Sequence, residues 1–262
     1  MLVKPIKPKC HHFYRYASTE KLDRLKPILL QNQLYFPSPS ELNDPAEGKP
    51  KPSRASESSL VRFLYDQYVA DKPNLSQAEC DRIKHFITEQ LHSIGCEQTL
   101  EYISGHTNPI INRNNKIYSL CKRWDNMSMW AKYANNYRGY CLEFKNSGLF
   151  SNAYEVYYSD EEITQDFTNL DEVDGYFFFY KKREWSNEEE VRIVTPSHIQ
   201  NPISFNPTLL RRVILGYKIP TKDKSQIIQW TKKRLIPLPV VQSRYNEFNH
   251  ALELININKP SN

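Results

Sequence analysis

Two glutamates and an arginine stand at alternate positions late in the chain, at Glu188, Glu190 and Arg192. If this segment is a strand, the three side chains share one face, because strand side chains alternate. Burying them is costly without a ligand or an ion-pair network, and paired carboxylates can act as a general base or hold a metal ion. A solvent-facing edge strand is the plainer alternative, and the spacing alone leaves both interpretations open.

Three further clusters combine aromatic, charged and amide side chains. They are residues 13–16, the turn Asn43-Asp44-Pro45 with Glu47, and residues 129–134. Aromatic side chains can line a ligand pocket, but they pack into hydrophobic cores just as readily. Asn-Asp-Pro is also a common turn sequence, so the second cluster fits a purely structural turn as well.

The elements that must position these clusters follow no regular strand–helix–strand alternation. This order predicts a mixed α+β fold in a single domain, 1–262. Two helical patterns after a Lys/Pro/Ser-rich stretch predict a helical insertion over about 57–112, and Pro27 should interrupt the first helix of the chain. Other helices are expected at 126–134 and 222–235, and strands at 12–16, 33–36, 116–121, 140–144, 154–158, 191–195, 212–215 and 252–257.

Composition narrows the classes of protein that the chain can belong to. Its 262 residues are 39% hydrophobic, 25% charged and 13% aromatic, which suits a soluble protein with a sizeable core. The formal net charge of +5 permits an anionic ligand such as a nucleotide or RNA without requiring one. Only 7 glycines occur, and no glycine-rich phosphate loop is present, which excludes the P-loop and ordinary Rossmann classes.

The same sequence predicts neither a metal site nor a membrane segment. Cys10-His11-His12 has no further ligand at zinc-finger spacing, and no apolar run approaches the roughly 18 residues of a membrane span. The five cysteines are widely spaced without a CxxC pair, and no secretory signal is evident. Reduced thiols and a cytoplasmic location are therefore expected.

Six short motifs follow one another along the chain. They are Tyr14-Arg15-Tyr16, Leu34-Tyr35-Phe36-Pro37-Ser38-Pro39, Asn43-Asp44-Pro45, Met129-Trp130-Ala131-Lys132-Tyr133-Ala134 with Gly139, Trp185-x-x-Glu188-x-Glu190-x-Arg192, and Val213-Ile214-Leu215-Gly216. In these motifs and their order the chain resembles the domain-of-unknown-function family 2971. It departs from that family in its long helical insertion.

The layout of that family is similar to that of ADP-ribosyltransferases, especially those that modify nucleic acids. The resemblance implies a core with a mixed, split β-sheet and a cleft that binds NAD as the substrate. Nicotinamide would leave, and a carboxylate would stabilise the positive charge on the ribosyl carbon. It further implies that Glu190 is the catalytic carboxylate and that Glu188 assists as a general base.

The resemblance also implies a set of NAD-binding residues. Arg15 would meet the phosphates or the ribose, and Ser119 would occupy the middle-motif position at the end of a strand. Asn43 and Asp44 would shape the cleft. The aromatic side chains that would pack against nicotinamide or adenine are Tyr14, Tyr16, Trp130 and Tyr133.

The resulting hypothesis is an NAD-dependent ADP-ribosyltransferase that modifies a macromolecule, with RNA favoured over protein as the acceptor, in bacterial phage defence or a toxin–antitoxin system. An antitoxin protein would then be a partner. A non-enzymatic nucleic-acid-binding module is one alternative, because the chain interleaves aromatic residues with basic runs such as Lys181-Lys182-Arg183. Solvated faces explain such runs as well. A metal-dependent nuclease that uses the same carboxylates is the other alternative.

Overall fold

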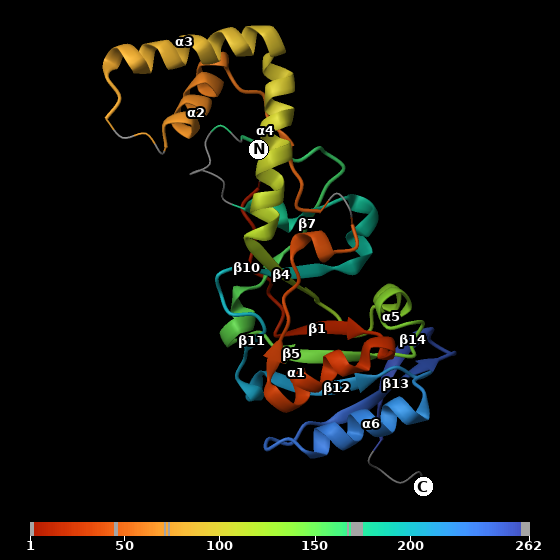
Figure 1. The fold of residues 1–262 in the computed structure, drawn as a ribbon. Coiled ribbons are helices and arrows are strands. Elements are labelled where there is room, and N and C mark those ends of the chain that lie inside the picture. The colour runs from red at the N-terminus through yellow and green to blue at the C-terminus, as the bar shows by residue number, and fades with distance from the viewer. Residues whose placement is uncertain are drawn as a thin grey trace.

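The computed structural model describes residues 3–44, 47–70, 72, 74–166, 168 and 175–257. Eight strands form its central sheet (Figure 1). In sheet order they are β14 (Ala251–Asn256), β13 (Val240–Asn246), β12 (Leu210–Leu215), β5 (Tyr140–Lys145), β1 (His12–Ala17), β4 (Asn115–Cys121), β10 (Glu190–Pro196) and β6 (Tyr154–Glu155).

The sheet is mixed, because β12 and β13 are parallel and the other neighbouring strands are antiparallel. The α+β class is therefore confirmed. Eight of the described strands form one large sheet, and the split sheet that the family resemblance implies stays a prediction. Three short pairs lie outside it: β2 (Gln33–Leu34) with β11 (Ile203–Ser204), β3 (Lys51–Pro52) with β8 (Thr164–Gln165), and β7 (Tyr157–Tyr158) with β9 (Tyr180–Lys181).

Helices cover both faces of the sheet, since each face carries apolar side chains that must be buried. One face receives α1 (Leu25–Gln31) and α6 (Thr221–Lys232), whose apolar side chains belong to the largest core cluster (Figure 1). The opposite face receives α5 (Met127–Tyr133), whose Trp130 is fully buried. The two faces of the sheet thus have different covers, and the candidate catalytic residues lie on the α5 side.

The first helix is interrupted, but the break lies before Pro27 and not at it. A 3-10 helix, η1 (Thr19–Arg24), leads into α1, so Pro27 stands in the first turn of α1. In that turn the missing N–H of proline costs no helical hydrogen bond.

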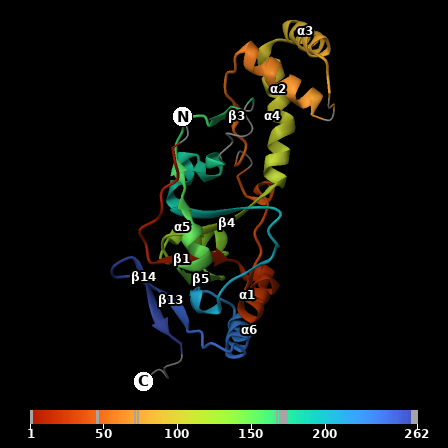
Figure 2. The same cartoon turned by 90° about the vertical axis from the view of Figure 1, so that its left-hand side faces the viewer.

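The helical insertion projects from the β4 side of the sheet, and its far end lies at the opposite end of the molecule from α6 (Figure 2). It contains the two expected helices, α2 (Glu57–Val69) and α3 (Gln77–Ile94), and a third one, α4 (Cys96–Arg113), that the sequence did not predict. Gly105 and Pro109 inside α4 are poor helix formers, which hides its pattern. The three helices bury a small core of their own, formed by Leu60, Ile87, Leu91, Leu100 and Ile103.

Strand β13 was also missed by sequence reasoning. Val240 and Val241 are followed by polar residues without a clear alternation, and Pro239 precedes them. The segment becomes a strand because β12 and β14 pair with it on both sides. In the other direction, the strand expected at 33–36 shrinks to the two residues of β2. Pro45, the last residue of the Asn-Asp-Pro turn, lies outside the described residues.

In the part of the chain that the structure describes, no helix is both long and apolar enough to cross a bilayer. All five cysteines are unpaired, and Cys121 and Cys141 are buried in the sheet. Neither finding assigns a function.

Gly139 allows strand β1 to approach the end of α5 closely. A Cβ atom at this position would overlap the backbone carbonyl of Ala17, which cannot move aside. We expect Gly139→Ala to lower the free energy of unfolding by about 1–3 kcal/mol or more. Thermal unfolding measures this loss.

Gly105→Ala is the matched control, because a Cβ atom there meets nothing within 4 Å. It should be neutral or stabilise the protein by about 1 kcal/mol, since alanine is the better helix former. Equal destabilisation by the two substitutions would contradict the close approach at Gly139.

Candidate functional site

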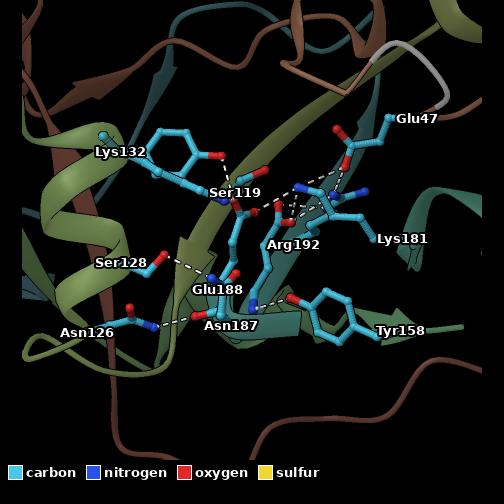
Figure 3. Close-up of polar contacts among 12 residues, drawn as sticks. Glu47, Ser119, Asn126, Ser128, Lys132, Tyr158, Lys181, Asn187, Glu188 and Arg192 are labelled. Carbon is cyan, nitrogen blue, oxygen red and sulfur yellow. Dashed lines mark hydrogen bonds and ion pairs between the residues drawn. The ribbon is translucent and has the colours of Figure 1, made fainter. Parts of the chain in front are cut away.

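Five charged side chains from four separate segments meet at β10, on the α5 side of the sheet (Figure 3). None of the five residues is more than 7% exposed. We refer to them as the charge cluster. Its members are Glu190 and Arg192 of β10, Lys181 of β9, Glu188 at the end of the 3-10 helix η6 (Arg183–Glu188), and Glu47 in a turn.

The alternation of β10 explains why two of these side chains point the same way. Val191 and Ile193 pack into the core cluster that includes α1 and α6. Glu190 and Arg192 therefore point to the opposite face, beneath α5. Since both are almost completely buried, the alternative of a solvent-facing edge strand is wrong.

Lys181 lies at the centre of the charge cluster (Figure 3). Its Nζ atom is 2.8 Å from Oε2 of Glu188 and 3.1 Å from Oε2 of Glu190. Oε1 of Glu47 lies 3.5 Å from the same nitrogen. One ammonium group thus contacts all three carboxylates, which would repel one another without it.

Arg192 holds Glu190 with two parallel hydrogen bonds. Nε and Nη2 of Arg192 each donate to one oxygen of the Glu190 carboxylate, and both distances are 2.8 Å. Nη1 donates to the backbone carbonyl of Phe178 at 2.6 Å, and Nη2 also pairs with Glu47. This bidentate geometry is the strongest arrangement for an arginine and a carboxylate, and it fixes both side chains.

Glu188 reaches the cluster by a route that the sequence did not predict. The helix η6 ends at Glu188, and Glu189 adopts left-handed backbone angles (φ 46°, ψ 48°) before β10 begins at Glu190. The prediction that Glu188 shares a strand face with Glu190 is therefore wrong, although their side chains do meet. The side-chain amide of Asn126 donates to the backbone carbonyl of Asn187 at 2.6 Å, which ties η6 to the start of α5.

An aromatic and basic rim borders Glu188. The hydroxyl of Tyr133 donates to Oε1 of Glu188 at 2.7 Å, and Nζ of Lys132 lies 3.6 Å from the same oxygen. The ammonium groups of Lys132 and Lys181 lie 4.4 and 4.8 Å from the ring centroid of Trp185. Because the side chain of Lys132 is 41% exposed, the rim connects the buried cluster to solvent.

Burial and neighbouring charges together raise the pKa values of Glu190, Lys181 and Tyr133. Burial raises the pKa of Glu190, and Lys181 and a hydrogen bond from Ser119 partly offset this rise. Burial would lower the pKa of Lys181, but Glu190 and Glu188 outweigh it and raise that pKa. Burial and then Glu188 raise the pKa of Tyr133 to about 12. Lys181 and Tyr133 are therefore protonated at neutral pH and act as hydrogen-bond donors.

No group of three or more histidine, cysteine, aspartate or glutamate side chains is arranged to hold a metal ion among the described residues. The three carboxylates of the charge cluster instead share two cationic side chains. A substrate that brings positive charge to this place would compete with Lys181 or Arg192 for the same oxygens.

Four of the residues expected to bind NAD lie next to the charge cluster. Ser119 is hydrogen-bonded to Glu190, and Tyr133 to Glu188. Asn43 is hydrogen-bonded to Tyr133. Burial lowers the pKa of Arg192 to about 9, and the nearby Asp44 partly offsets this lowering. Residues from distant parts of the sequence are thus brought together with the two glutamates.

The other four do not contact the cluster. Arg15 donates to the backbone carbonyl of Ser119 at 2.7 Å and lies over the ring of Tyr118, on the face covered by α1 and α6. Tyr14 lies on β1, two strands away from β10, and is the cross-strand partner of Glu143. The last two residues, Tyr16 and Trp130, pack edge to face inside the core, and their ring centroids are 5.2 Å apart. Packing in the core was the alternative that the sequence left open for such aromatic side chains.

Sequence reasoning missed Lys181, the most connected residue of the site. It stands in the basic run Lys181-Lys182-Arg183, which suits nucleic-acid binding or a solvated face. In the structure Lys182 is exposed and Lys181 is buried. One signal could have separated them, because Lys181 directly follows the aromatic run 176–180, which has to be buried.

Comparison with known proteins gives one match. Residues 129–193 fit the family model described as "Protein of unknown function (DUF2971)". The matched segment runs from α5 to β10 and contains four of the five charged residues of the cluster as well as its rim, so it supports the resemblance to that family. No curated protein and no solved structure matches the chain.

Lys181→Met should destabilise the protein strongly. It leaves three buried carboxylates with Arg192 as their one buried cationic partner, which typically costs about 3–5 kcal/mol. Lys182→Met is the matched control and should change the free energy of unfolding by no more than about 0.5 kcal/mol, because Lys182 is exposed. Urea unfolding of both variants measures the difference.

The loss in the free energy of unfolding that Lys181→Met causes should become smaller as the pH falls. Without Lys181, the pKa of Glu190 rises further above its usual value, so the folded state binds more protons than the unfolded state. Stability then increases as the pH falls from about 8 towards 5. A deficit that is independent of pH would mean that Lys181 acts through packing and not through its charge.

Proposed function

We propose that this chain is an NAD-dependent ADP-ribosyltransferase that modifies a macromolecule, with RNA as the favoured acceptor, in bacterial phage defence or a toxin–antitoxin system. The observation that carries the proposal is the carboxylate pair: Glu188 and Glu190 both lie within 3.1 Å of Nζ of Lys181 in a nearly water-free site. The ribosyl carbon becomes positively charged when nicotinamide leaves, and a fixed carboxylate in a dry site stabilises such charge strongly.

Glu188 makes the substrate contact in this proposal. Arg192 engages both oxygens of Glu190, whereas one oxygen of Glu188 faces Tyr133 and Lys132 at the rim. Glu190 then serves as a positioning residue that keeps Arg192 and Lys181 in place. The catalytic role that sequence reasoning gave to Glu190 passes to Glu188, because Glu188 is the glutamate with a solvent-reaching neighbour.

The chemistry assigns a task to each group at the rim. The bond between the ribosyl carbon and nicotinamide breaks, and nicotinamide leaves with the electron pair. Glu188 stabilises the positive charge, and a nucleophilic atom of the acceptor then bonds to the same carbon and gives its proton to the carboxylate. The rings of Tyr133 and Trp185 offer faces against which nicotinamide can pack.

Substrate entry requires the rim to move. Glu188 and Glu190 are 2% and 5% exposed, so NAD reaches them only after Lys132 and Trp185 shift. The contact between these two residues is a single cation–π interaction at a partly exposed position. Such a contact is worth about 0.5–1 kcal/mol, which a bound dinucleotide easily replaces.

The test is NAD consumption by purified protein, followed by mass spectrometry of RNA and protein for an added ADP-ribose. Glu188→Gln should lower turnover by about 100-fold or more, because the neutral amide can neither stabilise the cation nor accept a proton. Glu190→Gln should also lower turnover, and it should reduce stability because Arg192 loses one of its two charged partners.

Glu184→Gln is the matched control, since Glu184 lies on the same 3-10 helix and is exposed. It should leave turnover unchanged. Equal NAD consumption by wild type and Glu188→Gln would remove Glu188 from the mechanism. A wild type that leaves NAD intact overturns the proposal; salt-sensitive RNA binding would then identify a nucleic-acid-binding module, and RNA cleavage abolished by EDTA would identify a metal-dependent nuclease.

A further inference from the structure

A cavity lies on the sheet, on the same face as the charge cluster. It has a volume of about 360 Å³ and is lined by strand residues and Pro239, without a contribution from any helix. The side chains that give it chemistry are those of His12 on β1, Glu143 on β5, and Arg211 and Arg212 on β12. We refer to it as the arginine cavity.

An irregularity in β12 directs both arginines to this cavity. Neighbouring residues of a regular strand point to opposite faces, yet Arg211 and Arg212 line the same space. The pairing of β12 with β5 shifts register between Leu210 and Arg212, which leaves Arg211 as an extra residue in the strand. Such bulges re-aim side chains and are frequent next to binding sites.

A buried carboxylate holds one of the two arginines. Glu143 is 3% exposed, and Oε2 of its carboxylate accepts a hydrogen bond from Nε of Arg212. Nε2 of His12 lies 3.7 Å from the other carboxylate oxygen. Glu143 therefore fixes the guanidinium of Arg212 at the cavity wall. The bond uses Nε of Arg212, so its two Nη groups can still donate hydrogen bonds to a ligand.

Arg211 has no such partner. It is exposed, and it makes no ion pair or hydrogen bond with the described part of the chain. Two arginines and one glutamate thus line the cavity, which gives it a net positive charge. Paired guanidinium groups match the oxygens of a phosphate, because each presents parallel N–H donors.

The arginine cavity is aligned with the charge cluster across the sheet. Strand pairing connects Glu190 to Cys121, Cys121 to Tyr14, Tyr14 to Glu143, and Glu143 to Arg212. The row spans four strand spacings of about 4.8 Å, or about 19 Å in all. A phosphate bound at the arginines would therefore lie on the same face as Glu188 and Glu190 and within reach of an extended nucleic acid strand.

We propose that the arginine cavity binds a phosphate ester, either of a free nucleotide or of an RNA backbone. Its volume falls in the range of small-molecule sites and suits one nucleotide. This inference does not rest on NAD chemistry, because it concerns other residues and another ligand group.

Binding measurements test the proposal with matched ligands. AMP and adenosine differ by the phosphate alone, so calorimetry with both isolates its contribution. We expect wild type to bind AMP and to bind adenosine at least about tenfold more weakly, and Arg211→Ala to weaken AMP binding about tenfold or more. Arg62→Ala removes an arginine of α2 that is 86% exposed, and it should change neither affinity.

A short, fluorescently labelled single-stranded RNA forms the second arm. If the phosphate belongs to RNA, Arg211→Ala weakens RNA binding and reduces the salt dependence by about one phosphate contact, whereas Arg62→Ala does not. An effect on AMP alone identifies a free nucleotide, and an effect on RNA alone identifies the backbone. The proposal is overturned if neither ligand binds, or if Arg62→Ala weakens binding as much as Arg211→Ala. Neither outcome depends on NAD turnover.

Discussion

The buried ammonium group of Lys181 is the interaction on which the site depends. Strand β10 brings two members of the charge cluster, strand β9, helix η6 and the turn at Glu47 bring one each, and Lys181 contacts the three carboxylates. Repulsion between these carboxylates would otherwise drive the segments apart. Because these ion pairs are removed from water, breaking one costs far more free energy than breaking a surface pair. The charge cluster therefore holds the local backbone in place as well as the charged side chains.

Arg192 extends this control to the neighbouring hydrophobic layer. Its donation to the carbonyl of Phe178 ties β10 to the aromatic run 176–179, which packs with Ile117 in a small core beside the cluster. That core keeps water away, and hydrogen bonds and ion pairs are stronger in such surroundings. The site is closed as a result. In the proposed function, a substrate therefore has to displace Lys132 and Trp185 at the rim.

The α5 face of the sheet carries two polar regions with different designs. The charge cluster is a buried network of three carboxylates and two cations under the end of α5, whereas the arginine cavity is open, and its Arg211 has no ion pair with the described residues. Tyr16 and Trp130 pack in the core on this face and hold α5 on β1. Residues expected to touch NAD thus serve two tasks: Ser119 and Tyr133 touch the glutamates, while Tyr16 and Trp130 secure the helix that carries Tyr133.

The sequence by itself determined the α+β class, most of the strands and the segment of Glu188, Glu190 and Arg192, because strand alternation and helical periodicity are local patterns. The tertiary structure decided which charges meet. Lys181 and Lys182 look alike in a basic run, and their burial depends on where the aromatic residues before them pack. Glu188 joins the cluster through a left-handed residue that no periodic pattern encodes. The placement of Arg15 on the far face and the bulge at Arg211 follow from strand pairing, since register is set between distant segments and not within one.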